Sequence, residues 1–318
     1  MIKKTAKISF LKRLRYAPWF SQLVIVRRCN LSCSYCNEFD QTSSPVDLSV
    51  LKARLDKLKV LGTYAINLTG GEPTLHPDLP ELIRYCRHEL KFFKTTMISN
   101  GFLLKEELIH QLNEAGLQDM QISIDGVEPN RSTVKVLKSL EQKLVSLKQH
   151  AKFNVVVSAV VGSCPPEESF RVIQRAKELG FKPRVLLIHD HSGQVQLSEE
   201  QLKVFYQIKK MIPKSFPEFT DYRETMIAEG KAPFKCRGGS RYLYVDENGL
   251  VSWCSQTRQV FAKDLMDYQY EDLRREFYSY KSCQDQCTLG CVRAASSVDG
   301  WRKQELPQLN EELANPNN

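Results

Sequence analysis

The chain has 318 residues, of which 42% are hydrophobic and 26% are charged. These proportions are those of an ordinary folded protein, so they exclude a disordered or fibrous chain. The net charge of +8 is spread thinly apart from a basic N-terminal segment at residues 1–20, and indicates a solvated surface. Peripheral contact with a membrane or an acidic substrate stays open, and no nucleic acid partner is expected.

The apolar runs and the cysteines set the expected compartment. The longest apolar runs, such as NVVVSAVVG, are far shorter than the roughly 18 residues of a membrane-spanning helix. The N-terminus lacks the continuous apolar stretch and the cleavage site of a signal peptide, which predicts a retained, cytoplasmic protein. Ten cysteines in such a chain indicate metal or redox chemistry rather than disulfides.

Short β-branched segments alternate with amphipathic segments from residue 21 to about 212. Six strands are expected, reading QLVIV, YAINLT, TTMISN, MQISID, FNVVVSAVV and PRVLLIH. Helices are expected over residues 48–61, 79–90, 104–115, 132–149, 167–179 and 198–212. This recurrence predicts right-handed βαβ crossovers and an α/β fold with a parallel sheet, either doubly wound or curled toward a barrel. In both arrangements ligands bind at the carboxyl ends of the strands.

The pattern changes after residue 213. Several prolines break a less periodic stretch, and the next clear element is the hairpin SRYLYVDENGLVSWC, with its turn at residues 247–249. Residues 301–318 are polar and rich in Pro and Asn, which predicts a loose tail.

Three cysteines, Cys29, Cys33 and Cys36, directly follow the first expected strand. Zinc knuckles normally use paired C-x2-C arms that fill four ligand positions, and four-iron clusters are usually held by four thiolates. The spacing C-x3-C-x2-C supplies only three thiolate ligands. One metal position is therefore left open, and an open position is where metal chemistry takes place.

Small polar motifs follow the next three strands. Residues 69–73 read TGGEP, residues 99–101 read SNG and residues 123–126 read SIDG. Two adjacent glycines allow the backbone to approach a ligand closely. Each motif alone is compatible with an ordinary turn.

The four motifs in this order, over residues 20 to 212, resemble the radical S-adenosylmethionine (SAM) superfamily. The resemblance implies a partial (β/α)6 barrel, similar to a TIM barrel. It also implies a 4Fe-4S cluster on Cys29, Cys33 and Cys36, whose open iron binds the amino and carboxylate groups of SAM. Reduction, by a partner such as flavodoxin or ferredoxin, would release a 5′-deoxyadenosyl radical that removes a hydrogen atom from the substrate.

The resemblance further implies which residues contact the cofactor. Tyr35 matches an aromatic position near the adenine. The segment that meets the methionine amino group is Gly70, Gly71 and Glu72. The polar positions near the ribose and carboxylate are Asn100, Ser123 and Asp125.

A second cysteine set occupies the last quarter of the chain: Cys236, Cys254, Cys283, Cys287 and Cys291. Thiolates alone would allow a structural zinc site. The layout resembles the twitch and SPASM extensions of radical SAM enzymes, which hold auxiliary 4Fe-4S clusters. The count is below that of a full SPASM domain, so one auxiliary cluster is expected, held by Cys236, Cys254 and two of the last three. The expected division is a radical SAM core at residues 21–215 and a small iron-sulfur extension at 216–300.

Three further reactive side chains keep two interpretations each: His189, His191 and Cys164. His189 and His191 end the sixth expected strand and either contact a substrate or begin a solvated loop. Cys164 either donates a hydrogen atom to a product radical or is a plain loop cysteine. Cys86 falls on an apolar helix stripe and His76 is expected to be structural.

Two substrate classes remain open. A peptide or protein side chain is one, and a small metabolite such as a sugar, nucleoside or lipid precursor is the other. The short segment before Cys29 favours the small metabolite. The alternative from another class is a non-catalytic zinc or iron-sulfur interaction protein, which iron and sulfide analysis would separate from an enzyme.

Overall fold

The computed structural model describes residues 14–188, 195, 197–212, 222–258 and 260–299. Most of the predicted basic segment and the predicted tail lie outside these residues. So do His189 and His191, whose predicted roles therefore remain predictions. None of the described helices is both long and apolar enough to cross a membrane.

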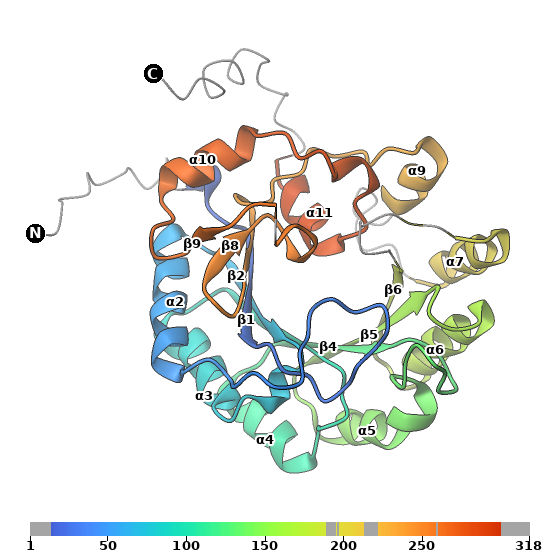
Figure 1. Cartoon of the computed structure of the whole chain (residues 1–318). Helices are drawn as coiled ribbons and strands as arrows, with labels where there is room; N and C mark the ends of the chain where they lie inside the picture. Colours follow the sequence, from blue (N-terminus) through green and yellow to red (C-terminus); the bar gives the residue numbers. More distant parts are fainter. Residues whose placement is uncertain (1–13, 189–194, 196, 213–221, 259, 300–318) are drawn as a thin grey trace, which may run out of the picture.

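Six parallel strands form a curved sheet with helices along its outer side, as Figure 1 shows. Their order is β6-β5-β4-β3-β2-β1, which confirms the predicted α/β fold with a parallel sheet. The strands are β1 Phe20–Val26, β2 Ala65–Gly70, β3 Lys94–Ser99, β4 Asp119–Ile124, β5 Asn154–Val161 and β6 Lys182–Leu187.

Six helical segments follow these strands in turn. They are α2 Leu48–Leu61, α3 Leu79–Arg84 with a π-helical turn Tyr85–Glu89, α4 Glu106–Ala115, α5 Leu137–His150, α6 Pro166–Glu178 and α7 Glu199–Met211. Each buries an apolar stripe against the sheet, as Leu51, Leu55 and Leu58 do in α2. Ser198 and Gln201 form the predicted capping box of α7.

The helix predicted from residue 132 begins only at Leu137. The side chain of Asn130 accepts hydrogen bonds from the backbone N–H groups of Ser132 and Thr133, at 2.8 and 3.0 Å. This local bonding holds residues 127–136 in a loop, because an Asn side chain competes with helical hydrogen bonding. The prediction of helix at residues 132–136 was therefore wrong.

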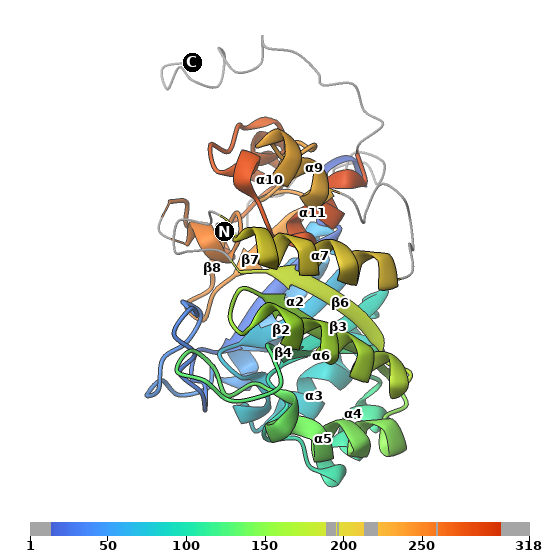
Figure 2. The same cartoon turned by 90° about the vertical axis from the view of Figure 1, so that its right-hand side faces the viewer.

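The C-terminal segments extend the same sheet. They comprise α9 Tyr222–Glu229, β7 Tyr242–Val245, β8 Leu250–Ser252, β9 Lys263–Asp264, α10 Tyr270–Tyr278 and α11 Gly290–Ser297. β7 and β8 pair antiparallel across the predicted turn, which confirms the hairpin. β7 also pairs in parallel with β1, so the full order is β6-β5-β4-β3-β2-β1-β7-β8-β9. In Figures 1 and 2, α9, α10 and α11 gather on one side, away from α3, α4 and α5.

A buried ion pair fastens this extension to the start of the barrel. Arg241 Nε lies 2.6 Å from Asp299 Oδ2, and the guanidinium also donates to the carbonyl oxygens of Leu14 and Ala17, at 3.0 and 2.7 Å. The Arg241 carbonyl accepts from the Phe20 N–H at 3.0 Å. The chain just before β1 is thus held to the chain just before β7.

Candidate functional site

The three N-terminal cysteines lie on the loop that leaves β1. The Cys29 N–H donates to the Asp40 carbonyl at 2.9 Å, which closes this loop. Burial raises the pKa of Cys29 and Cys36, while the N–H groups of Leu31 and Glu38, each 3.4 Å from a sulfur, act to lower it. The thiols of Cys29 and Cys36 are therefore protonated at neutral pH until a metal displaces the proton.

Gly70 and Gly71 lie against the first residues of the cysteine loop. The Gly71 N–H donates to the Val26 carbonyl at 2.9 Å, and the Glu72 N–H donates to the Arg28 carbonyl at 3.0 Å. A Cβ on either glycine would lie within 3.0 Å of backbone atoms of this loop. Only glycine permits so close an approach, and the exposed backbone of both residues faces the cavity beside the thiols.

Glu72 is buried and ties the ends of β2 and β3 together. Its carboxylate accepts from Thr74 Oγ1 at 2.6 Å, from Ser99 Oγ at 2.8 Å and from the Asn100 N–H at 2.7 Å. These partners occupy the carboxylate, and Glu72 does not line the cavity. Asn100 does line it, with Nδ2 lying 3.7 Å from the sulfur of Cys29.

Asp125 brings together the aromatic and cationic groups of the site. Its Oδ2 accepts from Tyr35 Oη at 2.5 Å and from Thr133 Oγ1 at 2.6 Å, and lies 3.6 Å from Lys135 Nζ. Its Oδ1 is buried and has no hydrogen-bond partner among the described residues. A buried carboxylate oxygen without a donor is costly, and the three partners of Oδ2 offset part of this cost.

A cavity joins these parts at the carboxyl ends of the strands. It is lined by Cys29, Leu31, Cys33, Cys36, Phe39, Thr69, Gly70, Gly71, Ile98, Ser99, Asn100, Ser123 and Lys135. Seven of the expected ligand and cofactor residues thus share one cavity, while Tyr35, Glu72 and Asp125 support it from behind. Lys135 was missed because the sequence pattern placed it in a helix. The polar Asn130 in the same stretch was the available sign of a loop.

A larger chamber of about 610 Å³ occupies the interior of the barrel. Parallel strands covered on both faces are normally apolar, yet each of several strands places a polar side chain here. Asn67 Nδ2 donates to Thr96 Oγ1 at 2.7 Å, and Arg184 Nη1 donates to Gln121 Oε1 at 2.9 Å. Ile98 lines both the chamber and the thiol cavity, so the two spaces adjoin.

The second cysteine set lies beside this chamber. Cys236 and Cys254 are buried, and burial raises the pKa of Cys254 to about 12, with the neighbouring Cys236 acting in the same direction. Burial raises the pKa of Cys287 too, and the charges of Cys236 and Cys254 add to this. Cys291 lines the chamber, whereas Cys283 is exposed.

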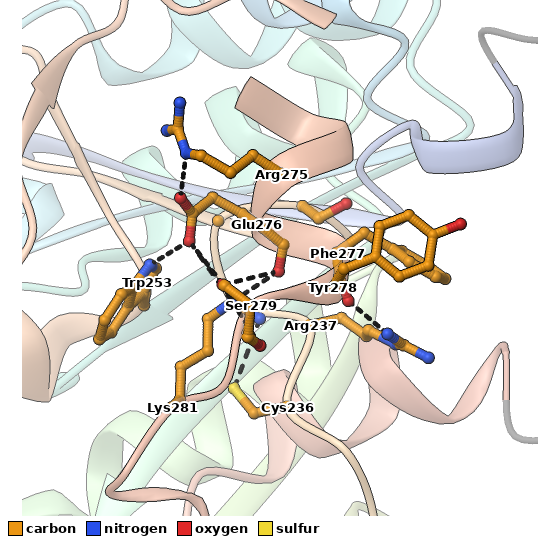
Figure 3. Close-up of polar contacts among 12 residues, drawn as sticks. Cys236, Arg237, Trp253, Arg275, Glu276, Phe277, Tyr278, Ser279 and Lys281 are labelled. Carbon is orange, nitrogen blue, oxygen red and sulfur yellow. Dashed lines mark hydrogen bonds and ion pairs between the residues drawn. The ribbon is translucent and has the colours of Figure 1, made fainter. Parts of the chain in front are cut away.

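A buried carboxylate, Glu276 of α10, holds the segments around these cysteines together (Figure 3). It accepts from Trp253 Nε1 at 2.7 Å and Arg275 Nε at 2.9 Å, and lies 3.4 Å from Lys281 Nζ. Lys281 is completely buried, which lowers its pKa, while Glu276 and the nearby Cys236 act to raise it. The network therefore joins the residue before Cys254 to the chain that approaches Cys283.

The remaining candidate side chains are placed outside both cavities. Cys164 is buried against Gly126, where Asn130 Nδ2 lies 3.2 Å from its sulfur, and burial raises its pKa to about 11. Cys86 is fully buried in the core, as predicted. His76 bridges the Val46 carbonyl, 2.8 Å from Nε2, and the Asp78 N–H, 3.1 Å from Nδ1, which fits the predicted structural role.

Comparisons with known proteins agree with this geometry. A Saccharolobus solfataricus protein named "Probable GTP 3′,8-cyclase" is 30% identical over 80% of this chain and 89% of its own length. A Methanosarcina barkeri protein named "Fe-coproporphyrin III synthase" is 34% identical over 36% of this chain, but the match spans only 29% of that relative. The structure of Streptococcus suis SuiB bound to precursor peptide SuiA shares the fold, with a TM-score of 0.64 and 16% identity over 82% of this chain and 66% of that one.

The residues of the thiol cavity fit the cofactors of one family. Three thiols leave one position of a 4Fe-4S cluster open, and the glycine backbone, Asn100 and Ser123 line the same cavity. The profile of the Radical SAM superfamily matches residues 23–195, which contain this cavity, most of β1 and the other five barrel strands. The chain therefore belongs to the radical SAM superfamily, whose enzymes bind SAM and a 4Fe-4S cluster.

Proposed function

We propose that this chain uses SAM to abstract a hydrogen atom from a small polar metabolite held in the barrel chamber. Cys29, Cys33 and Cys36 would hold a cluster that, once reduced, would supply the electron for cleavage of SAM into methionine and the 5′-deoxyadenosyl radical that takes this hydrogen. The observation that carries the proposal is the shared wall at Ile98, which places the chamber directly beside the thiol cavity. A radical made in the cavity would meet a substrate without crossing water.

The side chains of the cavity bind and orient in this proposal. Cys29, Cys33 and Cys36 hold the cluster, and Gly70 and Gly71 leave room for the amino group of SAM. As the resemblance implies, Tyr35 would lie near the adenine of SAM. The polar residues near its ribose and carboxylate would be Asn100, Ser123 and Asp125. The bonds that Glu72 makes to β3 keep these strand ends in register.

The substrate class rests on the chamber and on one relative. A volume of about 610 Å³ is the usual size of a small-molecule pocket. The Saccharolobus relative, which matches over most of both chains, is named for a reaction of a nucleotide. Substrates are tested by the increase in 5′-deoxyadenosine formation that candidate metabolites cause. Stimulation by a peptide alone would contradict a small-molecule substrate.

We further propose that the C-terminal cysteines hold a second 4Fe-4S cluster of the twitch or SPASM kind, on Cys236, Cys254 and two of the last three cysteines. Cys236 and Cys254 are buried in one cluster of side chains against which Cys291 packs, and this arrangement supports a shared ligand set. A cluster with four thiolates would accept or donate an electron rather than bind substrate. The electron for SAM cleavage would come from a protein such as flavodoxin or ferredoxin.

Metal analysis tests the two-cluster proposal. Anaerobically reconstituted protein should contain about eight irons and eight sulfides per chain. About four irons would contradict the second cluster alone. Zinc without sulfide would contradict the enzyme proposal and favour a non-catalytic metal-binding protein.

A further inference from the structure

Two arginines without an acidic partner among the described residues converge beside the chamber. Arg184 extends from β6 and lines the chamber, and Arg223 extends from α9 toward Gly290, another lining residue. A Cβ on Gly290 would lie 2.7 Å from Nη2 of Arg184 and 3.1 Å from Nη2 of Arg223. Both guanidinium groups thus meet at the first residue of α11, where a larger side chain would displace their ends.

The two positive charges are not neutralised within the described part of the chain. Arg184 donates to Gln121, and Arg223 donates to the Thr288 carbonyl at 2.9 Å, but neither forms an ion pair with a carboxylate. Arg223 is 9% exposed, and its buried Nε has no hydrogen-bond partner. Burial lowers the pKa of Arg184, and the charge of Arg223 lowers it further, as expected for two like charges held close together.

The surroundings favour an anion at this place. Residues 288–291, which end in the first turn of α11, line the chamber next to Arg184. The N-terminus of a helix presents unpaired N–H groups and a positive partial charge. Planar guanidinium groups match the geometry of carboxylates and phosphates. A buried pair of cations is costly unless an anion joins it.

We propose that Arg184, Arg223 and the N-terminus of α11 bind a phosphate or carboxylate group of the small-molecule substrate. The inference rests on the proposed function, because it takes the chamber as the substrate site. It narrows the substrate class to anionic metabolites. The unpartnered Nε of Arg223 and the convergence on Gly290 are the observations that point to a ligand.

Calorimetric titration of the reconstituted full-length protein tests this subsite. The probes are pyrophosphate and citrate, at low salt and without reductant. Wild-type protein should bind at least one of them, and the preferred probe distinguishes a phosphate from a carboxylate. Arg184→Gln and Arg223→Gln should each weaken that binding about tenfold or more, because each removes charge-assisted hydrogen bonds. Arg175→Gln, the same change at a partly exposed position of α6 that is distant in sequence from both arginines, should leave it within about twofold.

Two further variants keep the test decisive if a glutamine variant does not fold. Arg184→Lys keeps the charge but loses the planar fork, so binding should weaken. Gly290→Ala keeps both charges but fills the space between them, and should weaken binding as well. Thermal unfolding and iron content identify the variants that fold.

Three outcomes would overturn the inference. In the first, the wild-type protein binds neither pyrophosphate nor citrate. In the second, the folded variants bind the probe as tightly as the wild-type protein does. In the third, Arg184→Gln would shift the reduction potential of a C-terminal cluster while anion binding stays unchanged, so the arginines would serve the cluster. Binding is measured without turnover. Arginine-dependent binding with no 5′-deoxyadenosine formation would therefore contradict only the proposed function.

Discussion

At the scale of single residues, Gly71 shows how the backbone shapes the cofactor cavity. Gly71→Ala would press a Cβ against the carbonyl groups of Arg27 and Arg28, which cannot move without displacing the cysteine loop. We expect a loss of about 1–3 kcal/mol in the free energy of unfolding, and weaker SAM binding. Urea denaturation and calorimetry measure the two effects.

A second glycine provides the control for this prediction. In Gly230→Ala the new Cβ would have no atom within 4 Å, so the only cost to stability is the backbone strain of an alanine at a φ of 66°. We expect about 1–2 kcal/mol of destabilisation and no change in SAM binding. Equal SAM affinity in Gly71→Ala and wild-type protein would show that the glycine pair does not shape the cofactor site.

Cys164 gives a prediction about proton state. Burial, with help from the charges of Asp125 and Glu168, raises its pKa to about 11, so the native thiol keeps its proton at neutral pH. Only a protonated thiol can donate a hydrogen atom, which is one of the two interpretations of Cys164 from the sequence, the other being a plain loop cysteine. We expect iodoacetamide to alkylate Cys164 slowly at pH 8 in native protein and much faster in urea, where the pKa returns to about 8.5. Mass spectrometry of the tryptic peptides follows the reaction. Rapid alkylation of the native thiol would contradict the raised pKa.

At the scale of elements, the sequence predicted the strands and helices whose formation depends on residues close together in the chain. The six barrel strands were predicted because buried parallel strands read as β-branched runs, and the polar turns after them marked the carboxyl ends of the strands. The predicted start of α5 at residue 132 was wrong because the side chain of Asn130 accepts hydrogen bonds from backbone N–H groups that follow it, such as that of Thr133. The pairing of β7 with β1 was not predictable, since it joins segments more than 200 residues apart and has no local pattern.

Some residues of the candidate site could be predicted from the sequence, and others could not. Cysteines and glycines could be found from their spacing, because their chemistry and backbone freedom are properties of the residue itself. Lys135 and Arg184 could not, because a charged side chain in a loop or strand is ordinary until the structure shows that it lines a cavity. The partners that turn Glu72 into a link between β2 and β3 also come from separate elements.

The network between α10 and the late cysteines is testable through a double-mutant cycle. Glu276→Gln removes the carboxylate that faces the buried Lys281, and should cost about 3–5 kcal/mol in the free energy of unfolding. Lys281→Met should cost less, because Glu276 keeps its ion pair with Arg275. The double variant should cost less than the sum of the two single variants. Urea denaturation measures all three, with Glu178→Gln on an exposed helix surface as control. Small, additive effects would mean that the ion pair does not hold this region together.

At the scale of the whole molecule, one sheet runs through both the barrel and the C-terminal extension. Because β7 pairs with β1 and Arg241 binds the chain before β1, the two parts should unfold together. We expect one urea transition, coincident by circular dichroism and by fluorescence of the three tryptophans. Two of them, Trp19 and Trp253, lie at the start of the barrel and beside Cys254. Two separate transitions would show that the core and the extension are independent domains.

The central claim is that three cysteines hold a cluster that cleaves SAM beside a substrate chamber. The most direct measurement is 5′-deoxyadenosine formation by anaerobically reconstituted protein incubated with SAM and dithionite. We predict that the wild-type protein forms it, and that a variant with Cys29, Cys33 and Cys36 replaced by Ala forms none while keeping about four irons on its C-terminal cysteines. No 5′-deoxyadenosine from the wild-type protein, or undiminished formation by the triple variant, would contradict the account.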